Sequence, residues 1–265
     1  MRIDVYLVNN SHAESRQKAQ RLIKSGCVKI DGRVITKTSE ELDDAASHSV
    51  EISENESEKY VSRGGLKLEG ALAAFDVSPE GMVCADIGAS TGGFTDCLLQ
   101  KGAIRVYAFD SGKSQLHPTL ESDERVVSKE GFNARYITPD DVGEPVKLAV
   151  MDVSFISQTM IIPSLSRLID RDGIFITLIK PQFEAGRSAL GKNGIVKRKE
   201  DKLSAVVRVI ECAVGEGLDF RGLIPSPIKG GDGNEEFLAC FVKGEVGKVA
   251  APSVSDVKNI VYGKG

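Results

Sequence analysis

The sequence contains no tryptophan, only three histidines, and five cysteines that never form a Cys-x-x-Cys pair. Isolated cysteines in an odd number indicate reduced, mostly buried thiols and argue against a zinc site or a disulfide framework. No apolar run approaches the roughly 20 residues that span a bilayer, and the start MRIDVYLVNNSHAESR lacks the apolar core of a signal sequence. These absences predict a cytoplasmic protein without membrane contact and without a metal.

The charges are distributed unevenly along the 265 residues, which are enough for one α/β domain and a smaller unit. Residues 1–37 carry eight Lys or Arg against three acids, whereas residues 38–58 carry eight acids and neither Lys nor Arg. This asymmetry predicts a small basic unit followed by an acidic, Ser-rich connector. We therefore expect this unit and its connector over 1–59, a large domain over 60–245 and a C-terminal tail over 246–265.

The segment SRQKAQRLIKSG predicts a basic amphipathic helix. Its apolar positions are Ala19, Leu22 and Ile23. Gly26 predicts the end of the helix, and VKIDGRVI predicts a hairpin that turns at Asp31-Gly32. A charge run of this kind is usually a solvated helix face. Because nearly all of the charges have one sign and the unit is small, a binding module is favoured here.

The order of these elements and the residues RIDVYL and SRQKAQRLIKSGCVKIDGRVITKTSEEL resemble the S4 RNA-binding domain over roughly the first 45 residues. The resemblance implies that the helix and hairpin lie on structured RNA. Such contacts are mainly to phosphate and recognise shape more than base sequence. The candidate RNA contacts, chosen by charge and placement, are Arg2, Arg16, Lys18, Arg21 and Lys24.

From residue 60 onward, strand patterns alternate with helical patterns. The candidate strands are MVCADIG, IRVYAFD, KLAVMDVS, GIFITLIK, DFRGLIPS and EEFLACFV. This alternation predicts an α/β fold, Rossmann-like, with a mostly parallel sheet between helices on both faces and ligands at the carboxyl ends of the strands.

The stretch DIGASTGGFTD, residues 86–96, lies where a strand turns into a helix. Its glycines let the backbone approach a ligand, and its N–H groups lie beside the positive end of a helix. Dinucleotide binders, serine hydrolases and S-adenosylmethionine-dependent methyltransferases all use such a turn. The spacing G-x-S-x-G-G does not match the dinucleotide pattern G-x-G-x-x-G, although Asp110 after the next strand could hold a ribose hydroxyl. GASTG matches a nucleophile elbow, but no histidine follows His117 to serve as the late base.

The methyltransferase interpretation explains more of the sequence. Asp86 and the glycine turn suit the methionine part of S-adenosylmethionine, Asp110 suits the ribose diol, and FNAR could border the adenine. Judged by position alone, Asp110 is as often a helix N-cap as a ligand residue, and Asn133 is more often a plain turn residue. Both roles in ligand binding become more credible because the two residues fall near successive strand ends on the ligand side. The candidate cofactor residues are Asp86, Gly88, Ser90, Gly92, Gly93, Phe94, Asp110, Asn133 and Asp152.

Four further charges lie at the predicted ligand-facing ends. They are Lys67, Asp152, Lys180 and Glu236. Each alone is more often an ordinary surface or paired charge, but four of alternating sign indicate a site. A free lysine, with a pKa of about 10.4, is a poor base at neutral pH, and burial or a second lysine lowers that pKa. Lys180 beside Lys67 could therefore remove a proton from a hydroxyl that is being methylated, with the two carboxylates holding the lysines.

The motifs SRGGLKL, DIGASTGGFTDCLLQKGA, VMDVSFIS, LIKPQFEAG and GGDGNEEFL occur in this order. With them, residues 2–243 resemble the TlyA family, bacterial ribosomal RNA 2′-O-methyltransferases that join an S4 domain to an FtsJ-like catalytic domain. The resemblance implies S-adenosylmethionine as cofactor, ribosomal RNA or ribosomal subunits as partner and cytidine as target. It also implies a catalytic Lys-Asp-Lys-Glu set at Lys67, Asp152, Lys180 and Glu236.

Two segments, DSGKSQL and KEGFNAR, depart from the family's usual D-V-G and T-N-x-R contexts at the adenine end. The last catalytic position could also be Glu235, which is adjacent to Glu236; Glu236 is chosen from its place after GN.

The family label haemolysin suggests a membrane-active protein instead, but the sequence has no long cationic amphipathic helix. An RNA-binding protein with a non-catalytic methyltransferase fold is the other alternative, which the intact set of four charges disfavours. The sequence leaves the oligomeric state open.

Overall fold

The computed structural model describes residues 1–24, 26–43, 46–53, 59–230, 233–247 and 251–263. The chain divides into two compact units, Met1–Lys59 and Tyr60–Gly265. Several predicted features lie outside the described residues: parts of the acidic connector (44–45 and 54–58), Gly231 and Asp232 of the GGDGNEEFL motif, and parts of the tail (248–250 and 264–265).

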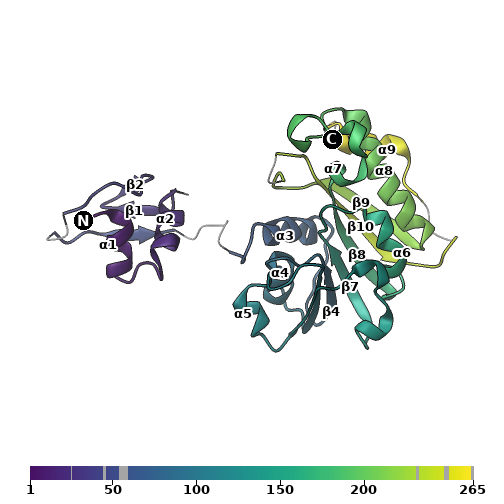
Figure 1. Ribbon diagram of the computed structural model, residues 1–265, viewed down its shortest axis with the longest axis horizontal. Helices are drawn as coiled ribbons and strands as arrows, with labels where there is room; N and C mark the ends of the chain where they lie inside the picture. The colour runs from purple at the N-terminus through teal and green to yellow at the C-terminus, as the bar shows by residue number, and fades with distance from the viewer. Residues whose placement is uncertain (25, 44–45, 54–58, 231–232, 248–250, 264–265) are drawn as a thin grey trace. The chain divides into compact units, whose positions relative to one another are not determined.

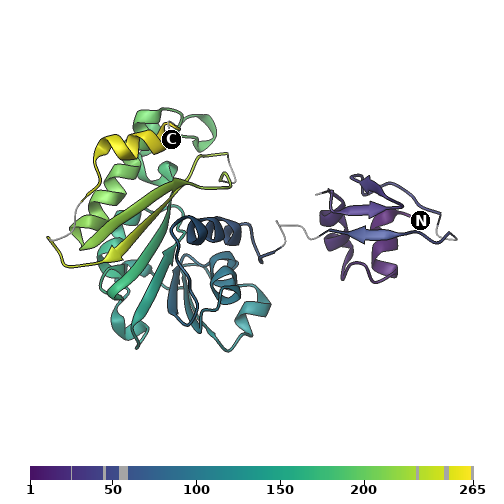
Figure 2. The ribbon, with the colours of Figure 1, turned by 180° about the vertical axis from the view of Figure 1, so that it is seen from behind.

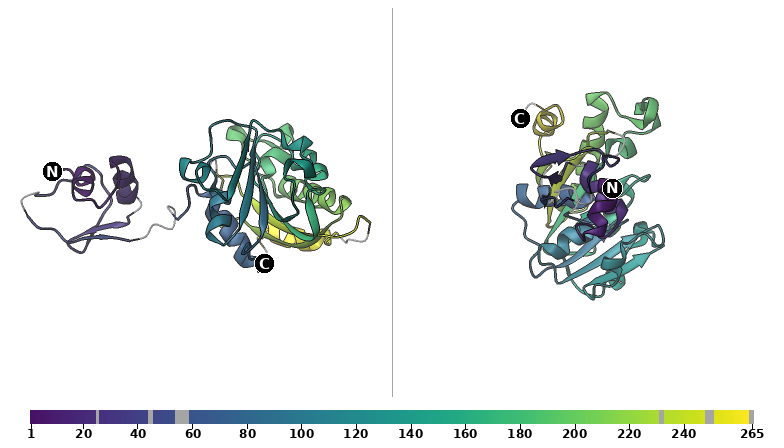
Figure 3. Two further views of the ribbon diagram at one scale, coloured as in Figure 1. Left: turned by 90° about the horizontal axis from the view of Figure 1, so that it is seen from below. Right: turned by 90° about the vertical axis from the view of Figure 1, so that its left-hand side faces the viewer.

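The N-terminal unit packs two helices on one face of a three-stranded sheet (Figure 3, left). Its elements are α1 (Ile3–Asn9), α2 (Arg16–Lys24), β1 (Val28–Ile30), β2 (Arg33–Ile35) and β3 (Val50–Ile52), with the strands in the order β2-β1-β3. Asp31 and Gly32 both have positive φ angles, 50° and 77°, as a type I′ hairpin turn requires. The predicted amphipathic helix and the predicted hairpin are both confirmed.

The strand β3 comes from the segment that the sequence indicated as a connector. Val50–Ile52 pairs antiparallel with β1, Val28 opposite Ile52. The stretch Val-Glu-Ile is too short for its alternation to stand out among eight acidic residues. The acidic segment therefore contributes to the N-terminal sheet as well as linking the units.

The larger unit contains a seven-stranded sheet in the order β6-β5-β4-β7-β8-β10-β9. The strands are β4 (Val83–Ile87), β5 (Arg105–Asp110), β6 (Val126–Glu130), β7 (Val146–Met151), β8 (Ile169–Ile179), β9 (Leu218–Pro225) and β10 (Phe237–Lys243). The strands from β6 to β8 in this order are parallel, and β10 is antiparallel to both β8 and β9. The mostly parallel sheet is confirmed. The edge strand β6 is absent from the candidate strands, because VVSKE is short and three of its five residues are polar.

Helices cover both faces of this sheet (Figures 1 and 2). One face carries α3 (Gly64–Ala74), α4 (Gly93–Gln100) and α5 (Pro118–Glu121), and the other carries α6 (Ile162–Leu165), α8 (Lys199–Gly215) and α9 (Val254–Val261). Alternate strand residues face the two sides, so that Leu148 packs under α3 and α4 while Met151 belongs to the core under α8. Burial on both faces explains why the central strands read as nearly continuous apolar runs.

The predicted C-terminal tail contributes to this core. Val257 and Val261 of α9 are buried together with Val206 and Ile210 of α8. The amphipathic spacing of VSDVKNIV therefore serves packing, and α9 belongs to the larger unit. No helix in the described part of the chain is long and apolar enough to cross a membrane.

The strand order creates a switch point between β4 and β7. The chain continues from β4 to β5 and β6 on one side, and later from β7 to β8 on the other side. Connections that diverge in this way leave a crevice at the carboxyl ends of the two central strands, where α/β proteins bind ligands. Gly88 follows β4 and Asp152 follows β7, so both lie at this crevice.

Candidate active site

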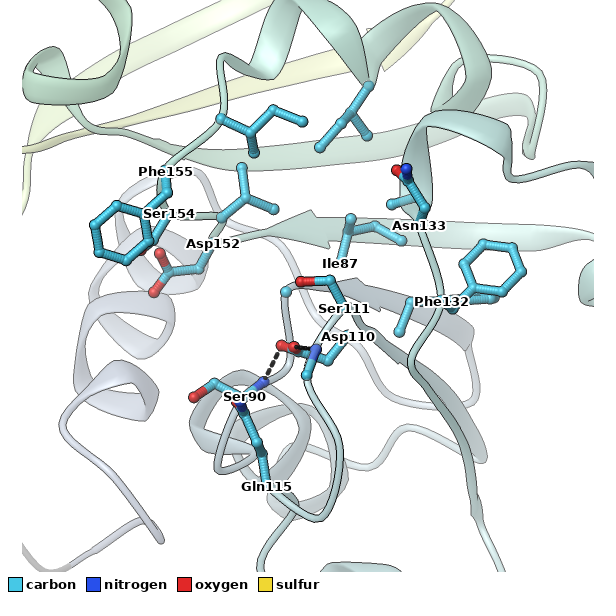
Figure 4. A pocket seen from close by; sticks show the side chains of 17 residues that line it. Ile87, Ser90, Asp110, Ser111, Gln115, Phe132, Asn133, Asp152, Ser154 and Phe155 are labelled. Carbon is cyan, nitrogen blue, oxygen red and sulfur yellow. Dashed lines mark hydrogen bonds between the residues drawn. The ribbon is translucent and has the colours of Figure 1, made fainter.

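A first cavity of about 460 Å³ opens at the switch point (Figure 4). Its polar side includes five of the predicted cofactor residues, Gly88, Ser90, Asp110, Asn133 and Asp152. Its apolar side is formed by Ile87, Phe109, Phe132, Val153, Ile156 and Ile161. This volume and this mixture of surfaces suit a small ligand with one apolar and one polar part.

Gly88 is required by the geometry of the turn. Its φ is +86°, and a Cβ atom there would lie 2.5 Å from the carbonyl oxygen of Asp152. Any larger residue would push β4 and β7 apart at the point where the cavity begins. The glycine turn therefore fits a ligand that must approach the backbone closely, as S-adenosylmethionine would.

Asp110 braces the cavity as well as lining it. Its Oδ2 accepts a hydrogen bond from the Ser90 amide at 2.8 Å, and its Oδ1 accepts one from the Gly112 amide at 2.7 Å (Figure 4). Because a carboxylate has about four acceptor positions, two remain for the hydroxyls of a ribose. The alternative role as a helix N-cap does not occur, since His117 caps the following helix, α5.

Glu130, at the end of β6, fixes the segment that departs from the family pattern. Its carboxylate accepts hydrogen bonds from the amides of Ser114, Gln115 and Leu116. These backbone hydrogen bonds hold the pKa of Glu130 below its ordinary value. Gln115 lines the first cavity, so Glu130 shapes the cavity wall without entering it. Sequence reasoning missed this residue because its partners are backbone groups 14 to 16 residues away.

Asn133 acts as a turn residue and a cavity residue together. Its side-chain oxygen accepts a hydrogen bond from the Arg135 amide at 3.2 Å and caps a short 3-10 helix, Ala134–Tyr136. Beside it in the cavity wall, the Phe132 ring packs against Phe109, with the ring centroids 5.1 Å apart. The cavity thus has an aromatic side opposite Asp152 (Figure 4).

Asp86 and Gly92, two of the predicted cofactor residues, line neither of the cavities described here. Asp86 is fully buried, and its Oδ2 accepts a hydrogen bond from the Thr95 hydroxyl at 2.7 Å. Burial raises the pKa of this carboxyl to about 7. Gly92 has a φ of +93°, and a Cβ there would lie 2.2 Å from Leu120 Cδ1. Both residues support the turn from within the domain.

A second cavity of about 280 Å³ adjoins the first. The two share Gly88, Ser90, Asp152 and Ser154. Lys67, Lys180 and the predicted cofactor residues Gly93 and Phe94 line the second cavity and not the first. Asp152 therefore stands on the boundary between a cavity that suits a cofactor and one that contains both lysines.

The four predicted charges form two lysine–carboxylate pairs. Lys180 Nζ lies 2.6 Å from Asp152 Oδ1 and donates a hydrogen bond to Ser154 Oγ at 2.9 Å. Lys67 Nζ donates to Glu236 Oε2 at 2.6 Å. The pairs come from α3, the end of β7, the end of β8 and the start of β10, which the sheet order brings together.

The adjacent acids 235 and 236 have different partners. Glu236 is buried beside Lys67, whereas Glu235 is exposed and pairs with Lys202 of α8 at 2.6 Å. Successive residues of an extended chain point to opposite sides, so only one of them can face the site. Asn234, which sequence reasoning missed, is buried and fixes this segment: its side chain accepts from the Val196 amide at 3.1 Å and donates to the Gly194 carbonyl at 3.2 Å.

Phe155 is a third residue that sequence reasoning missed. It lines the first cavity, has a φ of +65° and is 92% exposed. Its ring packs against Phe183, with the centroids 5.1 Å apart. A bulky residue with positive φ is uncommon and marks a constrained segment.

A family model described as FtsJ-like methyltransferase matches residues 60–243, and an S4 domain model matches residues 1–45. The chain belongs to the FtsJ-like methyltransferase family. The predicted S-adenosylmethionine-dependent methyltransferase is thereby confirmed, and a 41% identical relative named TlyA confirms the TlyA resemblance.

Similar proteins extend over most of this FtsJ-like chain. The 16S/23S rRNA (cytidine-2'-O)-methyltransferase TlyA of Mycobacterium tuberculosis is 41% identical over 89% of this chain and 88% of its own length. Hemolysin A of Brachyspira hyodysenteriae is 43% identical over 91% of this chain and 100% of its own. A solved structure from Streptococcus thermophilus, provisionally named a hemolysin, has a TM-score of 0.75 and 41% identity and covers 99% of this chain and 94% of its own.

In the S4 unit of this FtsJ-like methyltransferase, a buried aspartate orients two of the candidate RNA contacts. Asp4 accepts hydrogen bonds from Arg2 at 3.0 Å, Arg16 at 2.8 Å and Gln20 at 2.6 Å. Burial raises the pKa of Asp4, but these hydrogen bonds outweigh it and hold the pKa below its ordinary value. The remaining candidates, Lys18, Arg21 and Lys24, lie on α2. The burial of Asp4 could not be predicted from the sequence, because an acid in a first helical turn is ordinarily exposed.

Proposed function

We propose that this FtsJ-like methyltransferase transfers a methyl group from S-adenosylmethionine to the 2′-hydroxyl of a cytidine in ribosomal RNA. The observation that carries the proposal is the position of Asp152 and Lys180, paired at 2.6 Å where the two cavities meet. The names of similar proteins, which specify cytidine-2'-O methylation, support the choice of base and atom.

The first cavity is the proposed cofactor site. Gly88 and Ser90 would approach the cofactor through their backbone, Asp110 would accept hydrogen bonds from its ribose, and Asn133 would lie beside its adenine. The bound cofactor supplies an electrophilic methyl group. Asp86 and Gly92 hold the turn, while Gly93 and Phe94 border the acceptor side.

The second cavity is the proposed place of the target ribose. The bound cofactor would supply the methyl group to the 2′-oxygen, and Lys180 Nζ would take the proton that the hydroxyl loses. Asp152 and Ser154 hold Nζ in place. Lys67, held by Glu236, places a positive charge near the oxygen as it loses its proton.

Recognition of the RNA is assigned mainly to the S4 unit. Arg2, Arg16, Lys18, Arg21 and Lys24 are the proposed phosphate contacts, and Asp4 sets the direction of the first two. The exposed ring of Phe155 at the cavity offers a face on which an unstacked base could lie. With ribosomal subunits as the substrate, the site of action is the cytoplasm.

The test uses purified protein, tritiated S-adenosylmethionine, and separate 30S and 50S subunits from cells that lack the protein. The RNA is then digested to nucleosides. Label in 2′-O-methylcytidine supports reaction, atom and base together, and identifies the subunit. Label in another nucleoside contradicts the target, and no label in either subunit contradicts the proposed substrate. If calorimetry also detects no binding of S-adenosylmethionine, a non-catalytic RNA-binding protein becomes the better hypothesis.

A further inference from the structure

The second cavity carries a cation that the methyl-transfer step does not use. Its charged lining residues are Arg63, Lys67, Lys180 and Asp152. Lys67 and Lys180 each have a carboxylate partner at 2.6 Å. Among the described residues, Arg63 has neither a hydrogen bond nor an ion pair from its side chain, and it is exposed at the cavity.

Glycine packing brings more donors to the same cavity. Ser62, Arg63 and the first residue of α3 line it on one side, and the first two residues of α4 line it on another. A Cβ on Gly93 would lie 2.2 Å from Ser62 Oγ and 3.0 Å from the Gly65 amide nitrogen, so the two helix starts can abut because position 93 is glycine. Amides in a first helical turn have no partner within the helix and favour an anion.

The chemistry of the proposed substrate supplies such an anion. In RNA, every internal ribose with a 2′-hydroxyl carries a phosphodiester on the adjacent 3′-oxygen. A ribose whose hydroxyl reaches Lys180 therefore brings a phosphate into this same cavity, which also contains Asp152. Within the described part of the chain, Arg63 is the lining cation that no neighbouring carboxylate neutralises.

We propose that Arg63, with the backbone at the starts of α3 and α4, binds the phosphodiester that flanks the target ribose. This inference rests on the proposed function and deepens it. The guanidinium group matches a phosphate with two parallel hydrogen bonds. When Arg63 binds the phosphate, the neighbouring 2′-oxygen lies beside Lys180 whichever base is attached. The subsite therefore positions the ribose, and other contacts select the base.

The first experiment measures binding without turnover. Cytidine 3′-monophosphate and cytidine are titrated, by NMR, into the full-length protein saturated with S-adenosylhomocysteine. We expect the phosphate to strengthen binding about tenfold in the wild type, the lower end of the effect of hydrogen bonds to a charged group, and less than threefold in Arg63→Gln. The matched control is Arg167→Gln, an exposed arginine that lines neither cavity and donates to the Pro163 carbonyl at 3.1 Å.

Equal binding of the two compounds to the wild type, or no binding of either, overturns the subsite. An unchanged preference for the phosphate in Arg63→Gln overturns the role of Arg63. A phosphate preference that depends on Arg63, in a protein that methylates no ribosomal RNA, would keep the subsite and reject the proposed function. A second measurement is kinetic: on ribosomal subunits, Arg63→Gln should raise KM about tenfold, lower the salt dependence of kcat/KM by about one phosphate contact and leave cofactor affinity unchanged.

Discussion

The two lysine–carboxylate pairs of the site have the same length and different surroundings. Both lysine nitrogens lie 2.6 Å from a carboxylate oxygen, and both lysine side chains are about nine-tenths buried. The carboxylates differ: Asp152 is 21% exposed and lines both cavities, whereas Glu236 is 3% exposed and lines neither. Both lysines line the second cavity, but only Asp152 of the two carboxylates does so, and Glu236 is buried behind Lys67.

This difference separates the roles of the two lysines. A proton can leave or join Lys180 while Asp152 remains partly hydrated and within reach of other donors. Removing a proton from Lys67 would leave the Glu236 carboxylate charged in dry surroundings, which is strongly unfavourable. This contrast in burial supports the proposed roles, with Lys180 as the proton acceptor and Lys67 as a fixed positive charge.

The largest expected effect comes from removing the proposed proton acceptor. Lys180→Met should lower the single-turnover rate on ribosomal subunits by roughly a thousandfold, within the range for loss of a general base. Cofactor affinity by calorimetry should change less than twofold. Lys202→Met is the matched control, because Lys202 is equally buried and lies 2.6 Å from Glu235 outside both cavities. Undiminished turnover in Lys180→Met would remove Lys180 from the mechanism.

The second prediction compares the carboxylates by stability. Glu236→Gln leaves a largely buried lysine without its counter-charge and should lower the free energy of unfolding in urea by about 3 kcal/mol. Asp152→Asn disturbs a pair that water already reaches and should cost about 1 kcal/mol. Equal losses of unfolding free energy in the two variants would mean that the difference in burial between the two carboxylates does not affect how much each ion pair stabilises the fold.

The third prediction concerns a buried carboxyl that has a hydroxyl partner and no lysine. Burial raises the pKa of Asp86 to about 7, above its ordinary 3.8, so the folded state holds its proton more tightly than the unfolded state. The stability from this group is complete below about pH 4 and is lost as the pH rises to about 7. Relative to Asp86→Asn, the wild type should lose at most about 4 kcal/mol over that interval. A constant difference in unfolding free energy between pH 4 and 8 would contradict the raised pKa.

The smallest effect is expected for a cation outside the site. Lys18 on α2 lies 4.0 Å from Glu14, and both side chains are at least a third exposed. Lys18→Gln should raise KM for the ribosomal subunit a few-fold, lower the salt slope of kcat/KM by about one contact and leave kcat unchanged. A fall in kcat with constant KM would place Lys18 in the chemical step instead.

Local sequence patterns were sufficient wherever a local cause determines the structure. The Asp31-Gly32 turn follows from the need for two positive φ angles, and the strand ends that carry Asp152 and Lys180 follow from long apolar runs. The edge strand β6 was missed because three of its five residues are polar, and β3 because it has only three residues.

Tertiary contacts determined the rest of the site. No local pattern states that Glu130 bonds to three amides of another loop, or that Asn234 fixes the segment before Glu236. Asp86 is at a strand end as predicted, yet its side chain points into the domain, because a strand end fixes position along the sheet and not which face a side chain occupies. Arg63 belongs to the motif SRGGLKL, but only the folded structure shows that it lines a cavity and has no carboxylate partner among the described residues.

The position of β10 has a consequence for the order of synthesis. β10 follows β9 in the chain but lies between β8 and β9 in the sheet. When β9 leaves the ribosome it therefore has no neighbouring strand, and the edge of β8 remains uncovered until residues 237–243 have been added. An uncovered, apolar strand edge readily pairs with the wrong partner. A translational pause just before β10 should therefore favour misfolding more than a pause of equal length just after it.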